Sequence, residues 1–294
     1  AIQVIKAMAL GSSRELSAEG KEKFRRSGMY HFLVVSGVHI GILVWVLHQI
    51  LHILHIPLRY RSFFLAAILL LYAGLTGFHF PVLRATIMAL ILYFSITCNR
   101  IPDPLYGLAF SVSIILFIFP TALFEVSFQL TVAATTSILF LYRFLRHFSW
   151  WERCSHFPYL IRLPLMTLLM AAGAMIGISP LLVFYFQQLH PYSLVSNLVA
   201  LPVISLLLPF SLFSSTLSLF LPWNLIYPLL SVNVFLAKWF TFLTTLFPEF
   251  DVVLPQPTPL MLVIYYVSVY CGLNFYMFVL HHKSAKVTKK EESA

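Results

Sequence analysis

Charge is the scarcest property of this 294-residue sequence. Asp, Glu, Lys and Arg together make up 10% of the residues, whereas 60% are hydrophobic. A soluble domain has roughly one quarter of its residues charged, so this chain has too little charge to cover a water-soluble surface. The shortage excludes an ordinary soluble globular domain and indicates an integral membrane protein, whose apolar surface contacts lipid.

Cysteine and nucleotide-binding motifs are also scarce or missing. The three cysteines, Cys98, Cys154 and Cys271, form no CxxC pair and no Cys/His metal spacing, which favours free thiols. The sequence has no Walker loop and no dinucleotide fingerprint. We therefore expect no cofactor and no metal site in the chain, and we expect partners to supply the energy for any transport.

Long apolar segments fill most of the chain after residue 29. Because a spanning helix needs about 20 apolar residues, we predict an all-α, polytopic membrane protein with about nine hydrophobic segments. Gly and Pro interrupt several of them, which predicts broken or re-entrant helices such as those that line cavities in transporters. The segments are 30–56, 62–78, 82–98, 104–120, 122–142, 160–187, 193–221, 223–247 and 259–282, and the predicted breaks are Ser36-Gly37, Gly77 to Pro81, Pro120, Ser179-Pro180, Pro202 and Pro209.

Composition divides the chain into three predicted parts. Residues 1–28 form a basic amphipathic segment, expected at the lipid interface, with a helix between Ser17 and Gly28. Residues 29–282 form one membrane-embedded domain, and residues 283–294 form a basic, disordered tail. The lysines of the tail place it in the cytoplasm by the positive-inside rule. Because the sequence begins in mid-pattern without an initiator Met, we expect it to be an excerpt of a longer protein.

Polar side chains inside apolar segments are the first candidates for function. Arg84 follows Pro81 in such a segment, where a charge costs at least about 2.5 kcal/mol. It either lines a pore or forms an ion pair with Glu125. Lys238 is expected to reach the lipid headgroups. Gln129 and Asn197 are expected to hold neighbouring helices together by hydrogen bonds.

Histidines permit two chemical alternatives. Ser36 and His39 have the residue types of a nucleophile and its base, and His48 and His52 lie one helical turn apart, as metal ligands do. Neither pair has a third group in its local sequence, whether an acid or a further ligand. We therefore favour packing or pore-bordering roles for His39 and His31. Two GxxxG sequences, at 37–41 and 173–177, indicate close helix packing.

One long phrase identifies a family. Residues 24–41, FRRSGMYHFLVVSGVHIG, resemble the phrase FRRTGLxHLLAVSGLHVG of the membrane competence domain of ComEC-type DNA-uptake proteins. The chain departs from the family pattern at Ser12, where the family usually has Asp, and at Thr131, where it has Ser. Three shorter resemblances follow in the family's order, at Gly77–Met88, Ser127–Ala134 and Ser196–Pro202.

The resemblance implies a channel in the bacterial inner membrane that passes single-stranded DNA into the cytoplasm during natural transformation. It also implies a DNA receptor outside, a helicase-like motor inside and, in full-length members, OB-like and metallo-β-lactamase-like domains. This chain has no HxHxDH-type cluster, so we expect no nuclease and no other enzyme activity in it. Membrane lipid and a second copy of the chain are the remaining expected partners.

The sequence leaves alternatives to a DNA channel open and also nominates residues for specific roles. Two alternatives to a DNA channel stay open: an intramembrane enzyme that depends on a metal or on Ser36 and His39, and a channel or transporter for small solutes on the same scaffold. The candidates for the pore or DNA path are Arg84, His39, Ser36, Gly37, Arg25 and Arg26. The candidates for structural polar groups or helix breaks are His31, Gln129, Glu125, Asn197 and Pro202.

Overall fold

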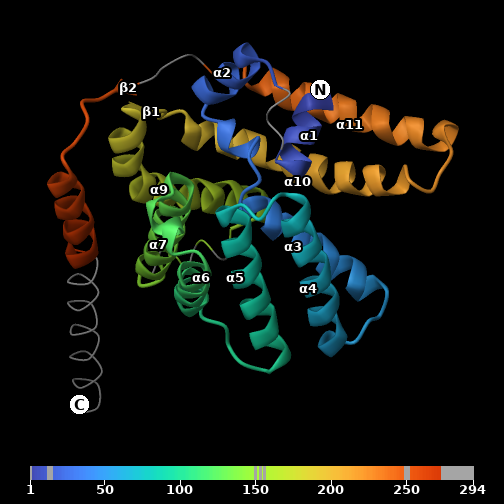
Figure 1. Ribbon diagram of the computed structural model, residues 1–294, viewed down its shortest axis with the longest axis horizontal. Coiled ribbons are helices and arrows are strands. Elements are labelled where there is room, and N and C mark those ends of the chain that lie inside the picture. Colours follow the sequence, from blue (N-terminus) through green and yellow to red (C-terminus); the bar gives the residue numbers. More distant parts are fainter. Residues whose placement is uncertain are drawn as a thin grey trace. The chain divides into compact units, whose positions relative to one another are not determined.

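The computed structural model describes residues 2–11, 16–148, 151, 154, 157–247 and 252–272. Helices make up most of this part of the chain (Figure 1). Two short strands, β1 (Gln188–Leu189) and β2 (Val252–Val253), pair antiparallel. The predicted all-α class is confirmed, and the predicted tail at 283–294 lies outside the described residues.

Each of the nine predicted apolar segments contains a helix in the described part of the chain. Six helices are long and apolar enough to cross a membrane, namely α4, α5, α7, α9, α10 and α11, whereas α3, α6 and the helix Pro259–Gly272 are shorter. The count of nine crossings is therefore not confirmed. The elements are α1 (Ile2–Leu10), α2 (Ala18–Arg26), η2 (Tyr30–Phe32), α3 (Gly37–Ile53), α4 (Leu58–Leu75), α5 (Phe80–Thr97), α6 (Pro104–Ile118), η3 (Pro120–Phe124), α7 (Val126–Leu145), α9 (Tyr159–Phe186), α10 (Ser193–Leu217) and α11 (Trp223–Leu243).

The chain folds as two compact units. The first comprises residues 1–132 and 190–251, and the second comprises residues from 133 to 189 together with the segment that follows residue 251. Within the first unit, α10 packs on α11, and α5 packs on α3, α4 and α6.

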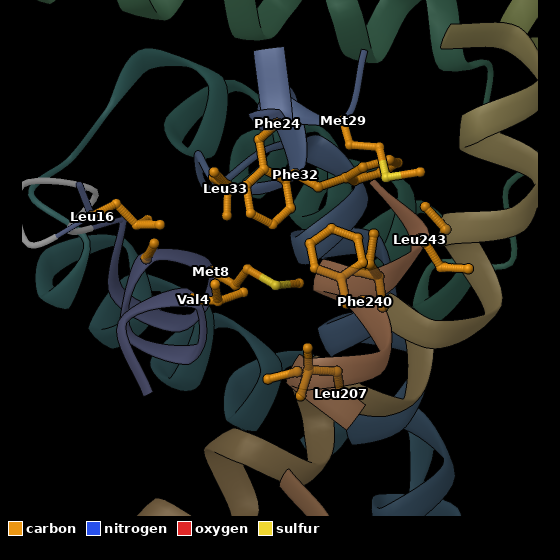
Figure 2. Packing of buried hydrophobic residues seen from close by; sticks show 14 residues of the cluster. Val4, Met8, Leu16, Phe24, Met29, Phe32, Leu33, Leu207, Phe240 and Leu243 are labelled. Carbon is orange, nitrogen blue, oxygen red and sulfur yellow. The ribbon is translucent and has the colours of Figure 1, made fainter. Parts of the chain in front are cut away.

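A hydrophobic cluster joins the N-terminal helices to α10 and α11 in the first unit (Figure 2). The ring of Phe240 on α11 lies 5.3 Å from the ring of Phe24 and 6.4 Å from that of Phe32, centroid to centroid. Val4 and Met8 of α1 are buried in the same cluster. Full burial of one such side chain is worth about 1.5–3 kcal/mol, so the basic helix α2 is attached to the protein through its apolar residue Phe24.

Three of the predicted breaks lie at helix boundaries. Helix α3 begins directly after Ser36, and η3 begins at Pro120. Between α4 and α5 the backbone turns through Gly77 and Phe78, which have φ angles of 81° and 52°. The N-terminus of α5 then contains Pro81, a position where the missing N–H of proline costs no helical hydrogen bond. These breaks confirm the prediction of interrupted helices.

The breaks predicted at Ser179-Pro180, Pro202 and Pro209 are wrong. Helix α9 continues through Pro180, and α10 runs unbroken from Ser193 to Leu217. A proline removes one hydrogen bond, but its φ is helical and the turns on either side can continue. At Pro180 the carbonyl left without its partner is that of Ile176, four residues earlier.

Tyrosines of the helix Pro259–Gly272 satisfy the carbonyls next to Pro180. The hydroxyl of Tyr265 donates to the Ile176 carbonyl at 2.9 Å, and the hydroxyl of Tyr266 donates to the Gly177 carbonyl at 2.7 Å. Neighbouring helices commonly satisfy backbone groups that a proline has freed inside a membrane. The second unit therefore holds this proline within a continuous helix by a contact with a segment distant in the sequence.

The two GxxxG sequences have different outcomes. A Cβ atom on Gly177 would lie 2.5 Å from Ser137 Cβ and 2.6 Å from the Ala133 carbonyl oxygen of α7. Gly173 likewise lies close to Leu141. Close packing is thus confirmed for the α9 sequence. In α3, by contrast, nothing lies within 4 Å of a Cβ placed on Gly41. The prediction of close helix packing is therefore wrong at the second glycine of that sequence.

The substitution G177A is predicted to destabilise the protein. Its new methyl group meets the α7 backbone, which cannot move away as a flexible side chain can, and overpacking of this kind costs about 1–3 kcal/mol. The matched substitution G41A adds the same methyl group in open space and raises helix propensity by up to about 1 kcal/mol. We expect G177A alone to lower the midpoint of thermal unfolding in detergent, and equal midpoints for the two variants would contradict this packing.

Candidate functional site

The candidate site lies where α3 begins, and the segment that leads to it is anchored on two sides. Met29, Phe32 and Leu33 are fully buried in the cluster of α1, α2, α10 and α11. Val35 is fully buried in a second cluster, formed by α3, α4 and α5. The apolar residues of the phrase at residues 24–41 thus fix Ser36 from both sides.

Gly28 is the turn that brings this segment against α10. Its φ is 72°, in the left-handed region that favours glycine. A Cβ atom here would lie 2.8 Å from Ser193 Cβ and 3.0 Å from Ser193 Cα, at the first residue of α10. Gly28 therefore meets two requirements at once, a positive φ and a close backbone contact.

Ser36 and His39 cap the N-terminus of α3. Ser36 is extended, with φ −124° and ψ 175°, and its backbone N–H donates to His39 Nδ1 at 3.2 Å, as in a capping box. Because Nδ1 accepts this bond, it carries no proton, and the Ser36 hydroxyl, 2.9 Å away, donates to it as well. His39 is completely buried, and its Nε2 makes no hydrogen bond within the described residues.

This geometry favours a structural role for His39 over a catalytic one. In a nucleophile–base pair, a third group orients the base through its second ring nitrogen. No side chain in the described part of the chain forms such a hydrogen bond with His39 Nε2. The polar side chain at the fourth position of Ser-Gly-Val-His is the local signal for a cap, although capping boxes usually have Glu or Gln there.

Arg84 of α5 lies beside the start of α3. Its side chain is 6% exposed, and a Cβ on Gly37 would lie 3.4 Å from Arg84 Nη2. Nη1 donates to the sulfur of Met88 at 3.3 Å, and Nε is buried without a partner. A thioether is a weak acceptor, so this guanidinium has little compensation for the loss of water. Met88 was not among the predicted site residues, although it lies one helical turn from Arg84.

The ion pair that could have compensated Arg84 is not formed. Glu125 is exposed between η3 and α7, and no contact joins it to Arg84 in the described chain. Gln129 Nε2 donates to the carbonyl of Leu123 at 2.8 Å, so it bridges the break before α7. Asn197 Oδ1 in α10 is buried without a hydrogen-bond partner.

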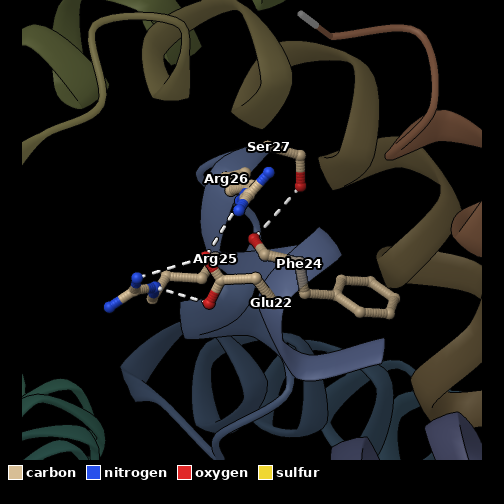
Figure 3. A network of polar contacts seen from close by, with 5 residues as sticks. All are labelled: Glu22, Phe24, Arg25, Arg26 and Ser27. Carbon is tan, nitrogen blue, oxygen red and sulfur yellow. Dashed lines mark hydrogen bonds and ion pairs between the residues drawn. The ribbon is translucent and has the colours of Figure 1, made fainter. Parts of the chain in front are cut away.

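Helix α2 carries the predicted basic residues as ion pairs (Figure 3). Arg25 and Arg26 both contact the carboxylate of Glu22, at 3.0 and 2.9 Å. Hydrogen bonds from Arg26 and then Arg25 lower the pKa of Glu22 below its ordinary value. A phosphate that binds either guanidinium must therefore compete with Glu22, although both arginine side chains are substantially exposed, by 46% and 40%.

The other histidines considered from the sequence, His31, His48 and His52, make contacts of their own. His31 is exposed, in η2, with its ring centroid 3.9 Å from that of Phe32. His48 Nδ1 lies 2.9 Å from the Tyr93 hydroxyl, and the His48 and His52 ring centroids are 6.5 Å apart. The described residues contain no group of three or more His, Cys, Asp or Glu side chains placed to hold a metal.

Taken together, these features define the class of protein: a multi-pass helical membrane protein with an interrupted helix beside a buried arginine. The chain belongs to the Competence protein family, whose model matches residues 8–278. This match confirms the resemblance to ComEC-type proteins that the phrase at residues 24–41 predicts. No solved structure matches the chain.

Three relatives are much longer than this chain. It is 26% identical to Recombination protein 2 of Haemophilus influenzae over 251 residues, which cover 80% of the chain and 32% of the relative. It is 28% identical to ComE operon protein 3 of Bacillus subtilis over 68% of the chain and 24% of the relative. It is 30% identical to an uncharacterized protein of Aquifex aeolicus over 66% of the chain and 42% of the relative. The chain spans less than half of each relative.

The substitutions H39Q and H39A are predicted to differ. A glutamine at this position can still accept from the Ser36 N–H, as in an ordinary capping box. We expect H39Q to keep the free energy of unfolding within about 0.5 kcal/mol of that of the unsubstituted protein, and H39A to lower it by about 1 kcal/mol. DNA uptake should follow stability. If H39Q folds normally but abolishes function as completely as H39A, the imidazole itself takes part in chemistry or binding.

Proposed function

We propose that this chain forms the passage through which single-stranded DNA crosses the bacterial inner membrane during natural transformation. Its membership in the Competence family supports this role, as do the names of two relatives, Recombination protein 2 and ComE operon protein 3. Helices that are interrupted at several points support a passage over a closed helical bundle, because irregular backbone at membrane depth occurs where it is buried or lines a cavity.

The observation that carries the proposal is Arg84. It lies in a helix long and apolar enough to span a membrane, it is 6% exposed, and no carboxylate in the described chain neutralises it. Such a residue costs several kcal/mol in a membrane, and it usually marks a substrate or ion pathway. A polyanion that passes close to the guanidinium offsets that cost, whereas a neutral solute does not.

The proposed direction of transport follows from charge. The basic residues Arg59, Arg61, Arg143 and Arg146 and the C-terminal tail would face the cytoplasm under the positive-inside rule. Helix α2 would then face outward, where its arginines meet incoming DNA. A DNA receptor outside and a helicase-like motor inside complete the proposed pathway, together with the OB-like and metallo-β-lactamase-like domains that the resemblance implies for full-length family members. In this scheme the chain conducts the strand and performs no covalent chemistry.

The substitution R84Q is predicted to reduce DNA import by at least about tenfold, because it removes the buried charge while keeping a polar, though shorter, side chain. The matched substitution K238Q removes an exposed lysine from α11 and should leave import unchanged. The measurement is the amount of labelled DNA that becomes nuclease-resistant in competent cells, with each allele replaced at the gene's own locus and protein levels compared by immunoblot. Normal import by R84Q cells would contradict the proposed passage.

A further inference from the structure

We propose that Arg84 and the first turn of α3 form a binding site for one phosphate group of the transported strand. This site rests on the proposed function and assigns the atoms that contact the DNA backbone. It requires three properties: hydrogen-bond donors without partners, positive potential, and access from outside the protein. Each is present at the start of α3.

Backbone donors are the first property. The leading N–H groups of a helix have no partner inside the helix. The first such groups of the 17-residue helix α3 belong to Gly37 and Val38, and neither makes a hydrogen bond within the described residues. The N–H of His39, by contrast, already donates to the Ser36 carbonyl at 3.1 Å. Two adjacent donors at the positive end of a helix are a suitable site for an anion.

The guanidinium of Arg84 is the second and independent property. Arg84 is only 6% exposed, its Nε has no partner, and its Nη2 lies 3.4 Å from the position that a Cβ atom on Gly37 would occupy. A cation next to a helix N-terminus is unfavourable by itself, because both are positive. The arrangement becomes favourable when an anion lies between them. Arginine can bind two oxygens of one phosphate at once, which a lysine cannot.

Gly37 shows how close the two elements lie. A Cβ atom on residue 37 would make ordinary van der Waals contacts, at 3.4 Å with Arg84 Nη2 and at 3.6 Å with Ala85 Cβ. The first residue of α3 and the guanidinium are therefore near neighbours, within reach of the same ligand. The neutral His39 behind them adds no charge that would bind the anion in place of Arg84.

Access is the third property. Ser36 and Gly37 are partly exposed, and Val38 is 38% exposed, so the start of α3 is reachable although Arg84 itself is nearly covered. A phosphodiester carries a single negative charge that one guanidinium neutralises, and the strand presents such groups at regular intervals. The site thus suits a strand that moves past it, one phosphate at a time.

The test measures how oligonucleotide binding depends on salt. The full chain in nanodiscs of zwitterionic lipid is titrated with fluorescein-labelled oligothymidylate at several salt concentrations. Each phosphate contact to a single strand contributes about 0.7 to the slope of log K against log salt. We expect R84Q to reduce the slope by about 0.7 and to weaken binding by about tenfold or more, whereas K238Q changes neither.

Two further variants separate the site from a general loss of folding. R84K keeps the charge but loses the forked geometry, so its slope should stay while its affinity falls. G37A keeps Arg84 but places a methyl group 3.4 Å from Nη2, where the proposed phosphate would lie, so its affinity should fall with a normal unfolding midpoint. An oligomer with an uncharged methylphosphonate backbone should bind the original protein and R84Q equally.

Several outcomes would overturn the site. An unchanged salt slope in R84Q would do so, and so would a preference for the original protein that persists with the uncharged backbone. If phosphatidylglycerol in the nanodiscs abolishes the difference between R84Q and the original protein, the site binds lipid headgroups and the assignment to DNA is wrong. Deletion of the gene tests the proposed function separately: lost import with an unchanged slope rejects only the site, and normal import rejects the function.

Discussion

A membrane interior has no water to satisfy a polar group, and the candidate site depends on how the chain meets that constraint. Several of its polar groups have a protein partner. Tyr265 donates to the carbonyl freed by Pro180, His39 accepts from the Ser36 N–H, and Gln129 donates to a carbonyl of η3. Among the described residues, Arg84 is the charged side chain whose buried nitrogen lacks one. Five uncharged side chains in the described residues, Asn197 among them, also have a buried atom without a partner. A buried charge without compensation costs more than a buried uncharged group, so a ligand best explains Arg84.

Packing explains why a signature of this family is a long run and not a pair of residues. The segment between α2 and α3 is buried in two hydrophobic clusters in turn, with Phe32 in one and Val35 in the other. Gly28 meets the first residue of α10, and Gly37 meets Arg84. The apolar positions thus set the position of Ser36, and Ser36 sets where α3 begins and where its free N–H groups lie.

Local sequence predicted the elements well, because the length of an apolar run and the turn preference of Gly-rich or Pro-containing segments are properties of neighbouring residues. Helices lie in all the predicted segments, and the breaks at Ser36-Gly37 and Pro120 are present. The predicted breaks at prolines 180, 202 and 209 were wrong, since a proline with helical φ can lie inside a continuous helix. At Pro180 a distant residue compensates the freed carbonyl, because Tyr265 lies 85 residues beyond it. The neighbours of Arg84 were not predictable for the same reason: Glu125 was the acid expected beside it, but the fold places Gly37 there.

The proposed DNA path passes the start of α3, and photocrosslinking in competent cells tests this most directly. A photoreactive amino acid replaces Val38, at the first turn of α3, and separately replaces Phe63, which is 73% exposed on α4. The proposed path predicts crosslinks to incoming DNA at position 38 and none at position 63. Absence of crosslinks at position 38 in cells that import DNA normally, or equal crosslinking at both positions, would contradict it.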